Sequence, residues 1–219
     1  MFFKVNNFID NKKLLSDKGN MKKIGGGILA AGQSKRFGEP KQLLKWGDTT
    51  ILGKVVKEFK KAKFTKTYIV LGAYYKKILK KLLSEFTDCK ILFNNNWKHG
   101  MFTSIKKIVE KAIEDNLDYI LIHQADMPFI NSRILNLFIQ NSLTSSSELI
   151  IGTFENKPSH PYVLSKKLFN EVLNLNGEEG IRPIIRKYFE SSTKIKVPYL
   201  IGKQDIDTWQ DYWRLKNGI

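Results

Sequence analysis

The stretch Ile24-Gly-Gly-Gly-Ile-Leu-Ala-Ala-Gly-Gln-Ser-Lys-Arg-Phe-Gly-Glu-Pro-Lys41 decides the fold of this chain. Residues 24–30 carry an apolar run that predicts a short buried strand. The strand breaks at Gly32 into a loop of small and basic residues. Gly32 and Gly38 allow the backbone a positive φ and a close approach to a ligand. The stretch therefore predicts a strand that ends in a ligand-binding loop.

The loop after this strand has the chemistry of an anion site. Ser34 offers a hydroxyl, and the backbone N–H groups of such a loop can form an anion nest. Lys35, Arg36 and Lys41 add positive charge, and a guanidinium can bind phosphate in a bidentate way. Because open α/β sheets bind ligands beyond the carboxyl ends of their strands, we interpret the loop as a polyphosphate site. The simpler alternative is a tight turn with a solvated basic face.

Two better-known phosphate-binding motifs fit this stretch poorly. Residues 27–34 have the P-loop spacing G-x-x-x-x-G-x-S, but Gln33 stands where a P-loop has its lysine. Residues 25–30 match a loose dinucleotide fingerprint, yet the glycines precede the apolar run instead of following a strand. A P-loop ATPase and a dinucleotide-binding protein are therefore both disfavoured.

Strand-like and helix-like segments alternate along the chain. The predicted strands are 24–30, 66–71, 90–93, 119–123 and 149–153, and the predicted helices are 50–62, 74–86, 101–115 and 131–143. This alternation predicts an α/β fold with a single doubly wound, mainly parallel sheet and helices on both faces. We expect one domain over residues 21–219. Residues 1–20 are interpreted as a disordered N-terminal extension, or as the result of a misassigned start codon.

Composition restricts the class of protein. Hydrophobic residues make up 42% of the 219 and charged residues 26%, as in ordinary globular domains. No apolar run approaches the roughly 18 residues of a membrane span. A single cysteine, Cys89, excludes an internal disulfide and favours a cytoplasmic location. The net charge of +16 raises nucleic-acid binding as a possibility, but the lysines are scattered without interleaved aromatic residues, which favours a solvated surface.

Residues 29–41 resemble the signature L-A-A-G-x-S-x-R-M-G-x-x-K of the MobA-like nucleotidyltransferases, in particular that of the molybdenum cofactor cytidylyltransferase branch. The resemblance implies a Rossmann-like nucleotidyltransferase fold and a loop that wraps the triphosphate of a nucleotide. It makes Arg36 and Lys41 phosphate-binding, catalytic residues. L-A-A-G favours CTP, because the GTP-using branch has L-A-G-G. The nucleotide-binding residues that it implies in this loop are Leu29, Ala30, Ala31, Gly32, Ser34, Arg36 and Lys41.

Two acidic motifs point to a divalent cation. Asp126 follows a predicted strand and is well placed to hold Mg²⁺ against phosphate oxygens, although an Asp-Met-Pro turn is the simpler interpretation. The family carries G-D-Q-P or G-D-M-P here with its Asp as metal ligand, and Ala125 replaces the glycine. Residues 205–211 resemble the family's D-I-D-T-P-E-D, which implies a second metal ligand, Asp207. The alternative for this motif is a helix N-cap at Asp207 and Thr208.

Three weaker resemblances complete the expected site. Residues 94–105 resemble N-P-x-W-x-x-G-M-x-x-S-I, which assigns Asn94, Gly100 and Ser104 to the nucleotide, with Asn95 in place of the proline. Residues 159–161 resemble the family's G-H-P and make His160 a candidate contact for a pterin-like acceptor. Arg182, in a motif that resembles G-D-x-G-x-R, is the other acceptor-binding candidate.

The sequence thus predicts a Mg²⁺-dependent enzyme that transfers CMP from CTP to a phosphorylated acceptor, molybdopterin or molybdenum cofactor. A molybdoenzyme or its chaperone is the protein partner that the resemblance implies. Two alternatives have the same chemistry with an isoprenoid or a sugar phosphate as acceptor. Pro40-Lys41-Gln42 favours the isoprenoid enzymes, while Met127-Pro128 lacks the Arg-Pro that they usually show. The alternative from another class is a basic nucleic-acid-binding protein.

Overall fold

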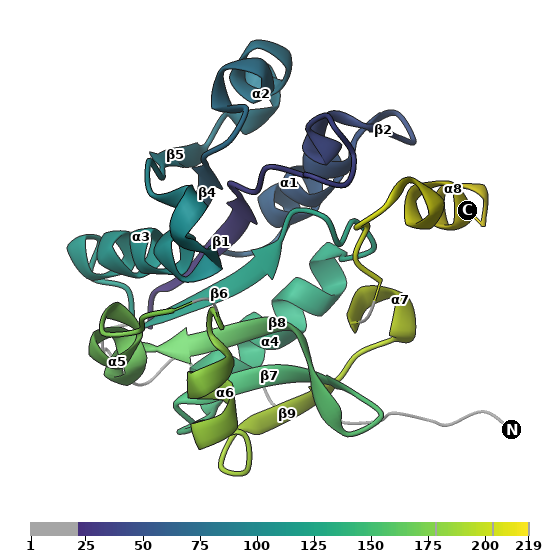
Figure 1. Cartoon of the computed structure of the whole chain (residues 1–219). Helices are drawn as coiled ribbons and strands as arrows, with labels where there is room; N and C mark the ends of the chain where they lie inside the picture. Colours follow the sequence, from purple (N-terminus) through teal and green to yellow (C-terminus); the bar gives the residue numbers. More distant parts are fainter. Residues whose placement is uncertain (1–21, 178, 203, 219) are drawn as a thin grey trace, which may run out of the picture.

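The computed structural model describes residues 22–177, 179–202 and 204–218. Its centre is a seven-stranded sheet with the order β5-β4-β1-β6-β8-β7-β9 (Figure 1). A two-stranded ribbon, β2 (Lys45–Trp46) and β3 (Thr49–Thr50), lies apart from it. The strands of the main sheet are β1 (Ile24–Ala30), β4 (Lys66–Leu71), β5 (Cys89–Phe93), β6 (Tyr119–Gln124), β7 (Leu149–Phe154), β8 (Lys157–Ser165) and β9 (Thr193–Lys196).

All pairings in the main sheet are parallel except those of β8, which runs antiparallel to both β6 and β7. The predicted mainly parallel sheet is therefore confirmed, and its five predicted strands correspond to β1, β4, β5, β6 and β7. The strands β8 and β9 were not predicted from the sequence. The proposed N-terminal extension, residues 1–20, lies outside the described residues.

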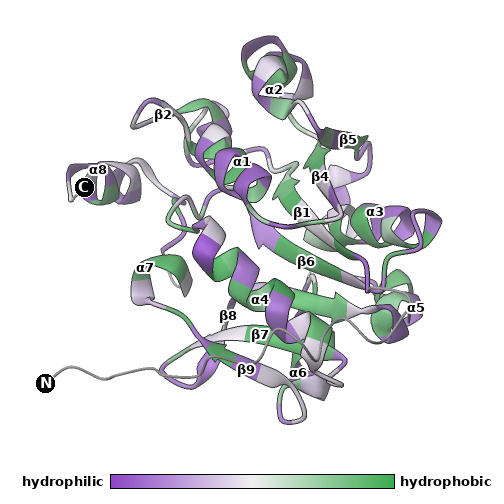
Figure 2. Ribbon diagram, turned by 180° about the vertical axis from the view of Figure 1, so that it is seen from behind, coloured by the Kyte–Doolittle hydropathy of each residue, from purple (hydrophilic) through white to green (hydrophobic). Residues whose placement is uncertain are grey.

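Helices cover both faces of the sheet, as a doubly wound fold requires (Figures 1 and 2). One face packs against α1 (Ile51–Lys61), α2 (Tyr75–Leu82), α4 (Ser132–Thr144) and α7 (Tyr199–Gly202). The other packs against α3 (Met101–Glu114), α5 (Phe169–Leu173) and α6 (Arg182–Tyr188). Figure 2 shows the apolar sides of α1 and α4 alternating with polar sides, as expected for helices that lie on a sheet.

The glycines of β1 allow the helices on both faces to approach this central strand closely. A Cβ on Gly27 would lie 2.7 Å from the Ile108 side chain of α3, and one on Gly26 would lie 2.8 Å from Phe64. The run Gly25-Gly-Gly27 is thus explained by packing across β1 rather than by ligand binding. The ligand-binding backbone begins where β1 ends.

The carboxyl ends of β1 and β6 form the topological switch point of the sheet. From β1 the chain builds outward through β4 and β5, then returns to place β6 on the opposite side of β1. Leu29 of β1 pairs with Gln124 of β6, so the loops that leave these two strands meet. Ligands of open α/β sheets bind at such a point. The predicted polyphosphate loop and Asp126 therefore lie side by side.

The D-I-D-T motif, residues 205–208, lies at this edge and directly precedes the last helix, α8 (Trp209–Asn217). Thr208 caps α8, and its hydroxyl accepts the backbone N–H of Asp211. Tyr212 of α8 packs with Trp46 of the β2–β3 ribbon, and Ile206 N donates to the Asp126 carbonyl oxygen at 3.0 Å. The cap is therefore Thr208, which leaves Asp207 outside the helix and directed to other partners. None of the helices in the described ranges has the length and apolarity to cross a membrane.

Candidate active site

A cavity of about 260 Å³ lies at the switch point of the sheet. Its walls come from the loop after β1, from the loop after β6 and from the start of α3. Eight of the residues that the sequence predicted for the nucleotide or the metal line it, namely Leu29, Ala30, Ala31, Gly32, Lys41, Gly100, Ser104 and Asp126. The sequence therefore identified most of this wall, which we call the first cavity.

The side chain of Gln42 fixes the shape of the loop after β1. It is buried, and its Nε2 donates to the carbonyl oxygens of Ala30 at 3.2 Å and Gly32 at 2.9 Å. Its Oε1 accepts the Ser34 hydroxyl at 3.3 Å, and that hydroxyl accepts Lys41 N–H at 3.2 Å. Ser34 does not line the first cavity. It holds the loop together through these two hydrogen bonds, and its contact with a nucleotide stays a prediction.

Lys41 lies between the two predicted metal ligands. Its Nζ is 2.6 Å from Asp126 Oδ2, 2.9 Å from Asp207 Oδ1 and 2.8 Å from the Ile206 carbonyl oxygen. Burial alone would lower the pKa of the Lys41 ammonium, but Asp126 and Asp207 outweigh burial and raise that pKa. Lys41 thus stays protonated and brings together two aspartates that lie 81 residues apart in the chain, from 126 to 207.

Arg36 is the most exposed member of this group. Its guanidinium lies 3.4 Å from Asp207 Oδ2, with 70% of the side chain exposed. An exposed pair of this kind contributes little to stability and is easily exchanged for another anion. Lys41 lines the first cavity, whereas Arg36 and Asp207 do not, and Asp207 links the two cations.

The two aspartates fit a small divalent cation that is shared with phosphate. Asp126 Oδ1 is buried and has no hydrogen-bond partner among the described residues. Asp207 lies across Lys41 from Asp126. In the described ranges no three His, Cys, Asp or Glu side chains gather into a metal site. Mg²⁺ takes one or two carboxylates when substrate phosphates complete its shell, so this donor set suits Mg²⁺ with a bound nucleotide.

Asn94 supports the wall formed by α3 rather than lining the cavity. Its buried amide donates to Thr103 Oγ1 at 2.8 Å and to Ser104 Oγ at 2.9 Å. Gly100, with φ of 115°, begins the 14-residue α3, whose first turn faces the first cavity. Unpaired N–H groups at a helix start attract anions. Ser104 and Gly100 thus line the cavity, and Asn94 positions Ser104; contact of the three with a nucleotide stays a prediction.

A larger cavity of about 690 Å³ adjoins the first and shares Met101 and Gln124 with it. Both predicted acceptor residues, His160 on β8 and Arg182 at the start of α6, line this second cavity. His160 is half-buried, its Nε2 lies 2.9 Å from Gln124 Nε2, and burial lowers its pKa to about 4. The histidine is therefore neutral near pH 7 and belongs to the sheet, not to a surface loop.

Sequence reasoning missed several residues that shape these cavities. Gln42 was not predicted as a site residue. Its burial could have been inferred from its place directly before Leu43 and Leu44. Gln124 comes directly before the metal motif and joins the two cavities. Tyr162 follows His160 by two residues, so strand periodicity could have placed both on one face.

An α/β sheet with a basic loop at its switch point, two facing carboxylates and two adjoining cavities is the arrangement of a nucleotidyltransferase. The family model described as MobA-like NTP transferase domain matches residues 26–193. Since the match spans most of the chain, the protein belongs to this family. The resemblance inferred from residues 29–41 is thereby confirmed.

Two curated relatives are both cytidylyltransferases. The chain is 24% identical over 185 residues to molybdenum cofactor cytidylyltransferase of Escherichia coli (strain K12), across 84% of this chain and 91% of that protein. It is 27% identical over 137 residues to 2-C-methyl-D-erythritol 4-phosphate cytidylyltransferase of Dictyoglomus thermophilum, across 60% of this chain and 57% of that protein. The two relatives act on different acceptors, as their names state.

A solved structure supports the fold. The crystal structure of a homologue of Mycobacterium tuberculosis rv0371c, from mycobacterium sp. strain JC1, superposes with a TM-score of 0.77 and 26% identity. The alignment covers 89% of this chain and 96% of that one. The Rossmann-like nucleotidyltransferase fold expected from the sequence is therefore confirmed.

Proposed function

We propose that the protein transfers CMP from CTP to a phosphorylated acceptor, molybdopterin or molybdenum cofactor, with release of pyrophosphate. The observation that carries this proposal is Lys41 held between Asp126 and Asp207, with Lys41 and Asp126 in the wall of the first cavity, which adjoins the second. Charges placed this way suit a polyphosphate on one side and a phosphorylated acceptor on the other. The two cytidylyltransferases among the relatives support CTP as the nucleotide.

In the proposed reaction an oxygen of the acceptor's terminal phosphate attacks the α-phosphorus of CTP. A new P–O bond forms as the bond to the β-phosphate oxygen breaks, and pyrophosphate leaves with the electron pair. A phosphate monoester is already ionised near neutral pH, so the enzyme needs no strong base. Catalysis then rests on positioning and on neutralising charge. Lys41 and Arg36 hold phosphate oxygens, and the backbone of residues 29–32 contacts the nucleotide.

Mg²⁺ is the cofactor that we propose for this site. Asp126 and Asp207 would hold it, and when bound it would neutralise charge on the α-phosphate and on the leaving group. In the free protein Lys41 occupies both carboxylates. We expect Lys41 to turn from the aspartates to the phosphates when nucleotide and metal bind, because it can then neutralise negative charge that develops during transfer.

The second cavity supports an acceptor with a phosphate and a partly apolar body. Arg182 supplies a cation at its rim, while Met127, Ile181 and Ile185 supply apolar wall. An isoprenoid precursor phosphate is the second candidate acceptor, and the Dictyoglomus thermophilum relative favours it. A sugar phosphate remains a third. We also propose a cytoplasmic location and a molybdoenzyme or its chaperone as recipient of the product.

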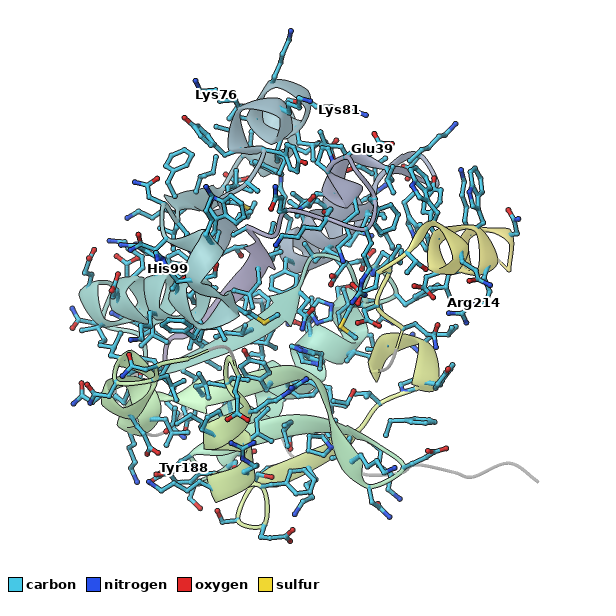
Figure 3. All side chains as sticks on the ribbon, in the orientation of Figure 1. Glu39, Lys76, Lys81, His99, Tyr188 and Arg214 are labelled. Atoms are coloured by element: carbon cyan, nitrogen blue, oxygen red, sulfur yellow. The ribbon has the colours of Figure 1, made fainter. Side chains whose placement is uncertain are left out.

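The lysine-rich surface does not require nucleic acid as a partner. Lys76 and Lys81 lie on the exposed side of α2 (Figure 3), and Lys81 Nζ donates to the Leu43 carbonyl oxygen at 3.3 Å. A positive field of this kind attracts small anionic substrates. A gel-shift assay distinguishes a nucleotidyltransferase from a nucleic-acid-binding protein, because non-specific nucleic-acid binding falls steeply between low and moderate salt. Retention of a shifted band in moderate salt would favour nucleic acid.

Pyrophosphate release tests the proposed function directly. The protein is incubated with Mg²⁺, each of the four nucleoside triphosphates and either molybdopterin or 2-C-methyl-D-erythritol 4-phosphate. Turnover that requires CTP and molybdopterin supports the proposal. If CTP is used only with 2-C-methyl-D-erythritol 4-phosphate, the proposed acceptor is wrong and this phosphate takes its place. If another triphosphate is used, the proposed nucleotide is wrong. No turnover and no CTP binding would overturn it.

A further inference from the structure

Tyr162 is a buried polar residue that takes no part in the proposed transfer of CMP. It lies in the middle of β8, paired with Ile122 of β6 and Ile151 of β7, and its side chain is 1% exposed. It lines the second cavity together with His160, whose ring centroid is 5.2 Å from that of Tyr162. Its backbone is fixed by two neighbouring strands, so the ring has a defined place beside the cavity.

The hydroxyl of Tyr162 has no hydrogen-bond partner among the described residues. Other buried tyrosines of this chain differ in that respect. Tyr68 is as fully buried, yet its hydroxyl donates to Asp115 Oδ2 at 2.7 Å. The hydroxyl of Tyr212 donates to the Lys45 carbonyl oxygen at 2.7 Å. A buried hydroxyl without a partner destabilises a fold, and phenylalanine would fill the same space without that cost.

We propose that the Tyr162 hydroxyl binds the acceptor, as a hydrogen-bond donor to a neutral carbonyl or ring nitrogen in the second cavity. This inference rests on the proposed function and adds a residue that selects the acceptor. The division of labour follows from the lining of the cavity. Arg182 supplies positive charge for the phosphate of the acceptor, and the apolar residues contact the body of the acceptor. The Tyr162 hydroxyl donates a hydrogen bond to an uncharged polar group of the acceptor.

The protonation state of Tyr162 agrees with a donor role. Burial raises the pKa of the phenol well above its usual value of 10.0, so the hydroxyl keeps its proton throughout the neutral range. His160 beside it is neutral as well, because burial lowers its pKa to about 4. The wall formed by these two rings therefore carries no charge. A neutral acceptor group suits it better than a second anion would.

The variant Tyr162→Phe tests the assignment in pyrophosphate release from CTP, with molybdopterin as acceptor. We expect KM for molybdopterin to rise about tenfold, while KM for CTP changes less than about twofold, because one hydrogen bond to the acceptor alone is lost. We also expect Tm of the protein without substrates to stay the same or to rise, since the folded protein loses no partnered group. An unchanged KM for molybdopterin, or a lower Tm, would overturn the assignment.

Tyr68→Phe is the matched control, because it removes a hydroxyl that the fold itself uses. We expect a lower Tm and an unchanged KM for molybdopterin, the reverse of the result at Tyr162. Failure of the proposed function is seen separately, since wild-type protein would then release no pyrophosphate with molybdopterin. In that event KM is compared with 2-C-methyl-D-erythritol 4-phosphate. If neither acceptor is used, the assignment falls with the proposed function.

Discussion

The two cavities differ in how their polar groups are satisfied. Around the first cavity, Gln42 and Ser34 bond within the loop and Lys41 is held by carboxylates, so that Asp126 Oδ1 is the buried side-chain atom of its described lining left without a partner. The second cavity has apolar wall, a neutral histidine and a tyrosine hydroxyl without a partner in the described structure. This order agrees with the proposal that the first cavity binds a phosphate chain, which is common to all nucleotides. The unpaired groups of the second cavity, His160 Nδ1 and the Tyr162 hydroxyl, are the ones that we propose to be available to an acceptor.

This difference predicts where substitutions act. Changes at the first cavity should affect binding of the triphosphate and the chemical step itself. Changes at the second should alter KM for the acceptor and leave CTP binding intact. The following variants test that separation, beginning with the greatest expected loss of activity.

Asp126→Asn should have the largest effect. Asparagine keeps the size of the side chain but removes the charge that pairs with Lys41 and that we propose holds Mg²⁺. We expect kcat for pyrophosphate release to fall about 10²- to 10³-fold, as for other losses of transition-state electrostatics. Asp48→Asn is the control, because Asp48 also pairs with a lysine, Lys57, at 2.9 Å but is 76% exposed. A wild-type rate in Asp126→Asn would show that this carboxylate is not catalytic.

Arg182→Gln should raise KM for the acceptor about tenfold, the effect of losing one charge-assisted contact to phosphate. KM for CTP should not change. Arg186→Gln is a matched control on the same helix and at the same cavity, because the Arg186 guanidinium is already held by both oxygens of Glu179. Equal effects of the two variants, or a rise in KM for CTP, would contradict the separation of the cavities.

Gln42→Leu should raise KM for CTP several-fold without changing KM for the acceptor. Leucine leaves the carbonyl oxygens of Ala30 and Gly32 without their buried donor, which costs on the order of 1–3 kcal/mol of folding free energy. We therefore expect Tm to fall as well. Gln33→Leu is the control, since Gln33 is an exposed glutamine in the same loop. If the two variants behave alike, the loop does not depend on Gln42 for its shape.

The smallest effect on activity is expected at Glu58, which lies on α1, away from both cavities. Burial alone would raise the pKa of Glu58, but its bonds to Lys54, Ser132 N–H and Lys61 lower that pKa to about 2. The charged form therefore stabilises the folded protein above pH 4.5. That contribution, on the order of 3 kcal/mol, is lost as pH falls from 4.5 to 2.

Urea unfolding as a function of pH measures this contribution. Glu58→Gln should be less stable than wild type at pH 7, and the difference should shrink as pH falls below 4.5. Wild-type kcat and both KM values should be retained at pH 7. A stability difference that stays constant from pH 7 to pH 3 would show that the charge of Glu58 does not contribute.

Much of the fold was predictable because its signals are local. The periodicity of residues 24–153 predicted five strands of the main sheet, and three short motifs, at residues 29–41, 100–104 and 126, predicted most of the wall of the first cavity. The strand β8, Lys157–Ser165, was not predicted. Its antiparallel place between β6 and β7 interrupts the βα alternation on which the prediction relied.

The sequence by itself determined the class of fold and the residues of the basic loop after β1, because each depends on neighbours in the chain; binding of a polyphosphate by this loop stays a prediction. Only the tertiary structure placed Asp207 on Lys41, 166 residues away, and gave Gln42 its two carbonyl partners. It also decided that His160 is neutral and that Tyr162 is buried without a protein partner in the described ranges. The burial of a residue and its hydrogen-bond partners depend on what packs around it, and segments distant in the chain supply that packing.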